Sequence, residues 1–401
     1  MSAETAGPAE SAMQGKNPRL PVSRELRDGY EVHRAALARG LSITLLPRQV
    51  LELQTADGES KSTFVHGVPQ GSKLSSVTYV QDLRMRRALL SRAGFKVPLG
   101  ATFSVGRSSG SAHRYAQRIR YPVVVKPAVG DNTVEVVRDI RNRRSLQKAI
   151  EYLHTPPSER PQNTRASYAL TELREPGEQD GKIIVPPGYR FLVEKQHRGQ
   201  YLRLLVLNGE LISALHCYGG PWNDDPDRRP EDILAVLHPS IGKTAQEAAA
   251  AIQGIALAAI DVVVPDYSRY TEVTQVNIVE YSERPWLQVQ HNSDPELAAA
   301  LGDTILSAGF GTDALSAPQD SLGVQFRIDG SVDPGGLLPV LREECQWLGI
   351  TVEAEVTDPV MGHIEGTMHG PPGDIAWVYE TVLDDAGLHG QRGMLVETRN
   401  Q

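Results

Sequence analysis

The residues with the clearest chemical potential lie where two apolar runs end. Residues 123–127 read Val-Val-Val-Lys-Pro, and residues 276–285 read Val-Asn-Ile-Val-Glu-Tyr-Ser-Glu-Arg-Pro. A lysine that leaves a buried strand supplies one fixed cation, and an acidic run that ends a second strand supplies carboxylates for Mg²⁺. A nucleoside triphosphate needs both kinds of group. The two motifs together therefore predict an enzyme that uses ATP.

Charged residues also interrupt apolar strand patterns. Asp261 lies in the run Ala-Ile-Asp-Val-Val-Val, where burial of its carboxylate is costly unless a cation or hydrogen bonds offset it. Glu280 has the same kind of surroundings, so a shared Mg²⁺ explains both acids more simply than two separate structural pairs. Arg203 is a cation within another strand pattern and is either a phosphate ligand or a structural partner of these acids. Glu194 ends its strand and either accepts hydrogen bonds from adenine or ribose or only terminates the strand.

Composition limits the class of protein. A chain of 401 residues is expected to form two or three domains. Its formal net charge of -8 argues against a general nucleic-acid binder. We interpret the basic clusters at residues 84–87 and 138–144 as solvated helix faces. Two cysteines are too few for a disulfide framework or a thiolate metal site.

No segment predicts export or membrane insertion. Residues 1–24 are rich in Ala, Ser, Gly, Pro and Glu and lack the apolar core of a signal peptide, so we expect a flexible tail. The longest apolar run, residues 248–264, is interrupted by Gln253 and Asp261, which disfavours a membrane span. We therefore expect a cytoplasmic protein.

Periodicity predicts an α+β protein. A helix at 26–39 and strands at 41–46 and 50–53 predict a small N-terminal α/β segment over residues 25–80. Further predicted elements are a helix at 82–93, strands at 121–126 and 191–194, a hairpin of 202–207 and 211–215 around Asn208-Gly209, a long loop or lid at 156–188 and a loop at 218–229. After residues 307–320, the pattern restarts with the order βαββαβ, which is typical of a ferredoxin-like domain.

At this point the order of the motifs resembles the ATP-grasp superfamily over about residues 82–310. The residues that carry the resemblance are Lys126, Glu194, Arg203, Asp261 and Glu280-x-Ser282-x-Arg284-Pro285, preceded by the helix and turn at 89–98. Within that superfamily the chain is similar to carboxylate–amine ligases, such as the ATP-grasp modules of cyanophycin synthetase and of bifunctional glutathione synthetase. The resemblance implies a small lobe (81–190) and a large lobe (191–312) that hold ATP between their sheets. It also implies phosphorylation of a carboxylate, attack by an amine, and release of ADP and phosphate.

The resemblance implies a role for each matched position. Lys126 would hold the phosphates, and Glu194 would lie at the adenine hinge, with Lys195 and Tyr201 also on the cofactor side. Asp261 and Glu280, with Ser282 beside them, would bind Mg²⁺, for which Mn²⁺ is an alternative. Arg203 and Arg284 would steady the γ-phosphate and the acyl phosphate.

The sequence departs from the family pattern at four places. The lysine usual after Asp82 is Leu83, with Arg84 and Arg86 as alternative cations, and the phosphate loop at 130–133 is poor in glycine. The ribose-binding acid is replaced by Tyr201, and the asparagine of the metal motif by Ser282. These departures favour either a divergent ligase or a non-catalytic nucleotide-binding or scaffold protein.

The C-terminal segment, residues 321–400, resembles an acylphosphatase domain in length and strand order. The position of the catalytic arginine is Leu337 or Leu338, and that of the asparagine is Asp358. Without that pair a phosphoryl group lacks both its cation and its water-positioning amide. We expect a role in substrate binding, closure or dimerisation, with hydrolysis as an alternative.

The expected partners of the whole protein are a small carboxylate and an amine, with a carrier-protein thiol as an alternative acceptor. We expect neither nucleic acid nor a membrane as a partner.

Overall fold

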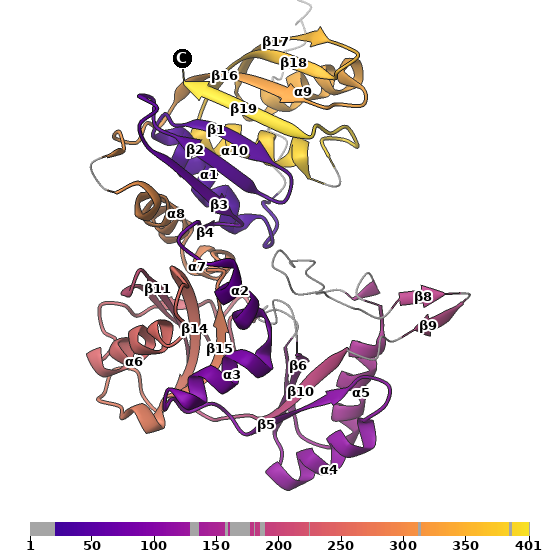
Figure 1. Ribbon diagram of the computed structural model, residues 1–401, viewed down its shortest axis with the longest axis vertical. Coiled ribbons are helices and arrows are strands. Elements are labelled where there is room, and N and C mark those ends of the chain that lie inside the picture. Colours follow the sequence, from indigo (N-terminus) through magenta and orange to yellow (C-terminus); the bar gives the residue numbers. More distant parts are fainter. Residues whose placement is uncertain are drawn as a thin grey trace, which may run out of the picture.

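The computed structural model describes residues 21–128, 136–156, 159–160, 177–179, 181–184, 189–223, 225–311, 314–384 and 387–400. Residues 1–20 of the predicted tail, the loop at 130–133 and the greater part of the predicted lid at 156–188 lie outside this range. Within it, no helix has both the length and the hydropathy that a membrane crossing requires. The described chain forms one large sheet at the top of Figure 1 and two smaller facing sheets below it.

The large sheet is antiparallel and is built from both ends of the chain. In spatial order its strands are β17 (Thr351–Asp358), β18 (His363–Gly370), β16 (Leu322–Asp329), β19 (Leu395–Asn400), β1 (Ser42–Leu46), β2 (Val50–Gln54), β3 (Lys61–Val65) and β4 (Val68–Pro69). Helices α1 (Arg27–Ala38), α9 (Pro334–Leu348) and α10 (Pro372–Leu383) cover one face, and α8 (Pro295–Phe310) packs on α1. Apolar residues alternate along the strands because only that face is covered, as in β16.

The predicted order βαββαβ is confirmed for the C-terminal segment by β16-α9-β17-β18-α10-β19. The sheet does not stop there, because β19 pairs with β1, which places Thr398 opposite Ile43. Segments 25–80 and 321–400, treated as separate units in the sequence analysis, therefore share one sheet and one core. Without this pairing β1 and β19 would both be open sheet edges.

The small lobe has a four-stranded sheet in the order β5 (Gly100–Ser104), β10 (Arg190–Lys195), β6 (Val123–Pro127) and β7 (Val137–Ile140). Helices α4 (Ser109–Ile119) and α5 (Arg143–His154) pack on it around an apolar core. A separate two-stranded ribbon contains β8 (Gly177–Gln179) and β9 (Lys182–Ile184). Residues 191–194 were expected in the large lobe, but β10 pairs with β5 and β6 instead. Glu194 therefore belongs to the small-lobe sheet.

The large lobe has a five-stranded sheet in the order β13 (Glu231–Asp232), β12 (Glu210–His216), β11 (Gln200–Leu207), β14 (Leu257–Val264) and β15 (Asn277–Ser282). Helix α6 (Pro239–Ala250) packs on it, and α2 (Leu74–Gln81) and α3 (Leu83–Arg92) lie along β15 toward the small lobe. Helix α7 (Gln288–Ser293) leads into α8. The predicted hairpin is confirmed, since β11 and β12 meet at Asn208 and Gly209, both with positive φ.

Candidate functional site

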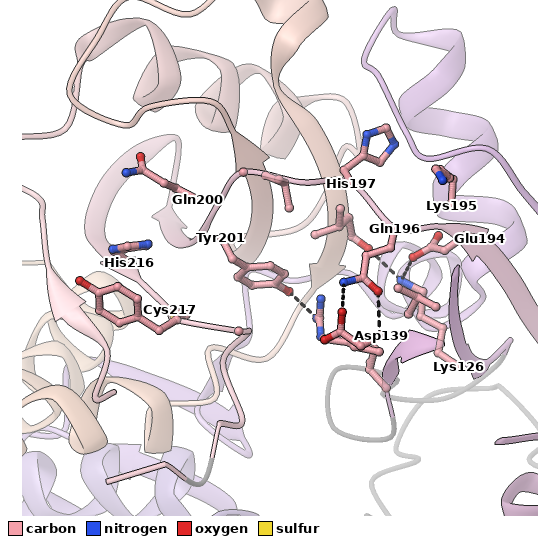
Figure 2. A pocket seen from close by; sticks show the side chains of 18 residues that line it. Lys126, Asp139, Glu194, Lys195, Gln196, His197, Gln200, Tyr201, His216 and Cys217 are labelled. Carbon is pink, nitrogen blue, oxygen red and sulfur yellow. Dashed lines mark hydrogen bonds and ion pairs between the residues drawn. The ribbon is translucent and has the colours of Figure 1, made fainter. Parts of the chain in front are cut away.

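A cavity of about 270 Å³ lies where the two smaller sheets face each other. Part of its lining comes from the segment from Lys195 to Gln200, which joins β10 of the small lobe to β11 of the large lobe. Figure 2 shows its lining side chains entering from both sheets, with Lys126 and Glu194 on one side and Tyr201 on the other. The strands that end in charged residues are thus brought to one cleft.

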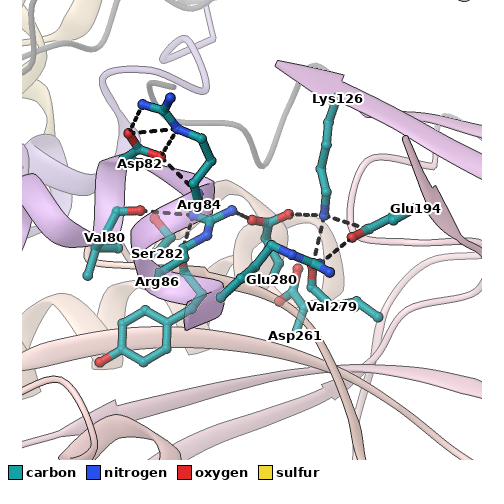
Figure 3. Close-up of polar contacts among 12 residues, drawn as sticks. Val80, Asp82, Arg84, Arg86, Lys126, Glu194, Asp261, Val279, Glu280 and Ser282 are labelled. Carbon is teal, nitrogen blue, oxygen red and sulfur yellow. Dashed lines mark hydrogen bonds and ion pairs between the residues drawn. The ribbon is translucent and has the colours of Figure 1, made fainter. Parts of the chain in front are cut away.

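Lys126 lies at the centre of a row of buried charges (Figure 3). Its Nζ atom is 2.7 Å from Glu194 Oε1 and 2.9 Å from Glu280 Oε2, and it donates a hydrogen bond of 2.9 Å to the carbonyl oxygen of Val279. The side chain is 2 % exposed. Because Glu194 comes from β10 and Glu280 from β15, this one ammonium group joins the two lobes.

Two arginines of α3 extend the row on both sides. Arg87 Nη1 donates to Glu194 Oε2 at 2.7 Å, and Arg86 forms an ion pair with Glu280 Oε1. Arg86 also donates to the carbonyl oxygen of Tyr281 at 2.6 Å. The resulting ion row has the order Arg87–Glu194–Lys126–Glu280–Arg86, with alternating charges.

Arg86 corrects the interpretation of residues 84–87 as a solvated helix face. It is 3 % exposed and shares the buried side of α3 with Leu83 and Leu90, whereas Arg84 pairs with Asp82 near solvent. A helical spacing of three and four residues from two buried leucines was the signal that could have identified it. Arg87 was missed for another reason, since its partner Glu194 lies more than a hundred positions away in the sequence.

Burial is the largest influence on the ammonium group of Lys126. It lowers the pKa from an ordinary 10.5 to about 8, although the neighbouring Glu194 carboxylate acts in the opposite direction. The cation therefore persists at neutral pH at a cost in free energy. A phosphate group that approached Lys126 would gain a strongly attractive partner, because the surroundings contain little water to screen it.

A second group of charges lies one strand further into the large lobe. Strand register places Asp261 of β14 opposite both Arg203 of β11 and Glu280 of β15. Arg203 Nε lies 3.1 Å from Asp261 Oδ1, and the hydroxyl of Tyr201 donates to Asp261 Oδ2 at 2.7 Å. Burial and the Asp261 charge keep the pKa of Tyr201 far above its ordinary value, so the phenol stays protonated as a donor. Arg138 of β7, not anticipated from the sequence, donates to the Tyr201 hydroxyl at 3.0 Å.

Arg203 has unused hydrogen-bonding capacity. It is 0 % exposed, and within the described residues none of its three guanidinium nitrogens has a hydrogen-bond partner of acceptable geometry. A buried donor without a partner is rare in folded proteins and usually indicates a ligand, an ion or water. Asp261 Oδ1 lacks such a partner as well. An oxyanion would satisfy the arginine, and a cation the aspartate.

The two carboxylates of this site suit a Mg²⁺ ion that is already bound to phosphates better than a Mg²⁺ ion held by protein groups alone. Asp261 and Glu280 are neighbours on adjacent strands, and Mg²⁺ commonly uses one or two carboxylates plus phosphate oxygens and water. Nowhere in the described part of the chain do three His, Cys, Asp or Glu side chains form a metal-binding group. Ser282 is buried, and its Oγ accepts a hydrogen bond of 3.1 Å from the backbone N–H of Arg284. The Ser282 hydroxyl thus already accepts a hydrogen bond within the local turn.

Arg284 and Lys195 have contacts that differ from the roles predicted for them. Arg284 donates to Asp28 of α1 from Nε at 3.0 Å and from Nη2 at 2.9 Å, and it lies 4.2 Å from the ring centroid of Trp286. These contacts fasten α1 to the large lobe, and the catalytic role predicted for Arg284 stays a prediction. Lys195 lines the cavity, but its Nζ donates to the carbonyl oxygen of Arg120 at 2.7 Å.

Comparison with known proteins gives only remote likenesses. Neither a family model nor a curated protein matches the chain. Among solved structures, D-alanine–D-alanine ligase from Bacillus anthracis complexed with ATP matches at 15 % identity and a TM-score of 0.40, over 59 % of this chain and 67 % of that one. A bifunctional glutathione synthetase from Pasteurella multocida matches at 15 % identity and a TM-score of 0.34, over 59 % of this chain and 37 % of that one. The ATP-grasp ligase PsnB complexed with minimal precursor, Mg and ADP matches at 13 % identity and a TM-score of 0.36, over 57 % of this chain and 59 % of that one. Likeness at this level does not assign the chain to a family.

Proposed function

We propose that the chain is an ATP-dependent carboxylate–amine ligase of the ATP-grasp kind. The nucleotide would lie between the small-lobe and large-lobe sheets, with its base near residues 195–200 and its phosphates near Lys126 and Arg203. The acid would be an amino acid or a short peptide. The products would be an amide, ADP and phosphate.

The observation that carries this proposal is the convergence of two buried cations with three buried carboxylates. Lys126 and Glu194 come from one sheet, and Arg203, Asp261 and Glu280 come from the other. Arg203 is wholly buried with unsatisfied donors. A structural ion cluster would be expected to satisfy those donors, whereas a phosphate-binding site leaves them for its ligand.

The residues would act by positioning and by neutralising charge. An oxygen of the substrate carboxylate attacks the γ-phosphorus, and the bond from that phosphorus to the ADP oxygen breaks. Lys126 and Arg203 would stabilise the charge that develops on the phosphoryl oxygens. The amine nitrogen then attacks the acyl carbon, the phosphate leaves, and the nitrogen gives up its proton to phosphate or water. Mg²⁺, held by Asp261 and Glu280, would supply further neutralisation of the phosphates.

Hydroxylamine trapping tests the proposal. The purified protein would be incubated with Mg²⁺-ATP, hydroxylamine and a panel of amino acids and short peptides, and hydroxamate and ADP would be measured. An acyl phosphate gives both products in equal amounts. Lys126→Met should abolish them, and Lys243→Met, an exposed lysine of α6, serves as the matched control. Release of AMP and pyrophosphate would contradict the proposal.

One set of contacts favours a second candidate, a non-catalytic nucleotide-binding or scaffold protein. Both carboxylate oxygens of Glu280 are already engaged by Arg86 and Lys126, and Ser282 serves a backbone N–H. A site that binds nucleotide without turning it over would need no metal there. Tight ATP binding without ADP formation for any tested acid would favour this candidate over the ligase.

For the C-terminal part of the large sheet, we propose a role in substrate binding, closure or homodimer formation without hydrolysis. Leu337, at the expected position of the acylphosphatase arginine, is fully buried in the core. That position offers no cation to a phosphoryl group. A carrier-protein thiol as acceptor, and the cytoplasm as location, stay part of the proposal.

A further inference from the structure

The outer surface of the small lobe carries a strong positive charge that the proposed ligase chemistry does not use. Residues 100–128 and 136–156 contain ten Lys and Arg residues and two Asp and Glu residues, although the whole chain has a net charge of -8. Of these cations, Lys126 and Arg138 face the cleft. The others are exposed on or next to α4 and α5. Residues 138–144 of this segment were expected to form a solvated helix face, but Arg138 lies in β7 and donates to Tyr201.

Five of these cations form what we call the basic face: Arg114 and Arg118 of α4, and Arg143, Arg144 and Lys148 of α5. All five are exposed. Arg114 and Arg118 are four residues apart, and Arg143 and Arg144 precede Lys148 by five and four residues. Each helix therefore carries its cations along one side. Like charges at this spacing repel each other, which makes the face mildly unfavourable in the isolated chain.

Within the described residues, acidic groups do little to neutralise this face. Asp139 binds the Gln196 amide at 3.0 Å and lies 3.9 Å from Arg141 at the edge of the lobe. Glu151 accepts a hydrogen bond of 3.0 Å from Gln147. None of the five cations of the basic face forms an ion pair with a described carboxylate. Their charge is therefore available to a partner.

The basic face borders a groove of about 660 Å³ between α4 and α5. One side of the groove is lined by residues of α5, namely Arg143, Arg144, Gln147, Lys148 and Glu151, and the other by Ser109, Gly110 and His113 of α4. Ser109 and Gly110 of α4 and Arg143 and Arg144 of α5 are first-turn residues, so two helix N-termini with their positive dipole ends meet at the groove. A Cβ atom at Gly110 would lie 3.7 Å from Arg114, which places that arginine at the groove as well.

We propose that the basic face and its groove dock an acidic segment of a partner polypeptide. Four of the five cations are arginines, whose planar guanidinium groups bind carboxylates in a bidentate manner. The rise from Arg144 to Lys148 along α5 is about 6 Å. That is close to the separation of about 7 Å between residues two apart in an extended chain, so alternating acidic residues match the spacing.

A nucleic acid fits this face less well than a polypeptide. Unstacked bases need exposed aromatic side chains, and no large exposed hydrophobic residue in the described chain lies on α4 or α5. The remainder of the chain is acidic and would repel a long polyanion beyond the groove. An acidic peptide segment of limited length avoids that repulsion.

Fluorescence anisotropy with the full chain tests the proposal. The probe is a fluorescein-labelled peptide of alternating Glu and Ser at physiological ionic strength, with single-stranded and duplex DNA of equal charge as competitors. Arg143→Glu/Arg144→Glu should weaken peptide binding by about tenfold or more, and a tenfold loss corresponds to about 1.4 kcal/mol of binding free energy. Arg228→Glu/Arg229→Glu, an adjacent exposed pair in the loop after β12, changes net charge equally and should leave binding within about twofold.

Each other outcome overturns the proposal. Absence of peptide binding by the wild type, or equal weakening in both double variants, would show that no specific acidic-peptide site exists. Binding of DNA in preference to the peptide would assign the face to nucleic acid instead. Because all four substituted residues are exposed, both variants are expected to keep the wild-type thermal melt. Both should also keep ATP binding, which separates this proposal from that of the ligase.

Discussion

The ion row predicts that Glu280 contributes more to folding stability than its lysine partner does. The row contains three cations and two carboxylates, all of them buried or nearly so. Lys126→Met leaves each carboxylate with one arginine. Glu280→Gln, in contrast, leaves three cations in the row with Glu194 as its one remaining carboxylate. We expect the second variant to be much less stable than the first.

The contacts of the row set the size of the effect. In Glu280→Gln, Lys126 can release its proton, and because its pKa is about 8 this costs on the order of 1 kcal/mol at pH 7. Arg86 cannot release a proton, and the loss of its charged partner costs about 1.5–3 kcal/mol. The expected loss is therefore about 3–4 kcal/mol, within the range for breaking a buried ion pair. Lys126→Met should cost less than about 1.5 kcal/mol, since it also removes the burial penalty of the ammonium group.

Urea unfolding followed by tryptophan fluorescence measures both effects. The folded pKa of Lys126, about 8, is below its ordinary 10.5, so the unfolded chain holds more protons between these values. Stability from this group therefore rises with pH across that window. Between pH 7 and pH 9 the wild-type lysine also loses its proton, so the part of the Glu280→Gln defect that comes from a neutral Lys126, about 1 kcal/mol, should disappear. Adding Arg86→Met to Glu280→Gln should restore part of the stability. A Glu280→Gln loss below about 1 kcal/mol at pH 7, or a further loss on adding Arg86→Met, would refute this account of the row.

Three further outcomes follow from the structure. Burial raises the pKa values of Cys217 and Cys345 to about 12, so neither thiol should react with Ellman's reagent until urea unfolds the chain. Burial lowers the pKa of His66 to about 3, so only the unfolded chain takes up this proton below about pH 6.5. Stability should therefore fall from pH 6.5 toward pH 3, and less steeply in His66→Gln than in the wild type or in the exposed control His389→Gln. Residues 321–401 expressed alone lose the β1 partner of β19 and should melt at a lower temperature than the full chain.

Clear results would contradict each of these expectations. Rapid thiol reaction in the native protein would mean that the cysteines are accessible. An unchanged pH profile in His66→Gln would assign the acid sensitivity to other groups. An equal melting temperature for the isolated segment would show that the pairing with β1 adds little stability.

The features predicted correctly from the sequence are those with local signals. Lys126, Asp261 and Glu280 stood out because each charge interrupts or ends an apolar strand, and the structure buries all three. The hairpin at Asn208 and Gly209 followed from its turn residues. The order βαββαβ followed from periodicity within one segment.

Features that depend on distant partners could not be predicted in this way. Arg87 and Arg138 have their roles only because tertiary packing brings α3 and β7 to the cleft. Arg284 was placed in the cleft because it follows the acidic motif, yet Asp28, near the start of the chain, binds it. The pairing of β1 with β19 joins the two ends of the chain and has no local signal.

The most direct test of the central claim is the equilibrium binding of nucleotide to the wild type and to Lys126→Met and Arg203→Met. Because buried cations would contact the phosphates, ATP with Mg²⁺ should bind in the micromolar range and adenosine much more weakly. Each variant should lose at least about tenfold in ATP affinity, since a charge-assisted contact is worth about 1.5–3 kcal/mol. Equal binding of ATP and adenosine, or wild-type ATP affinity in both variants, would contradict a phosphate site between the two sheets.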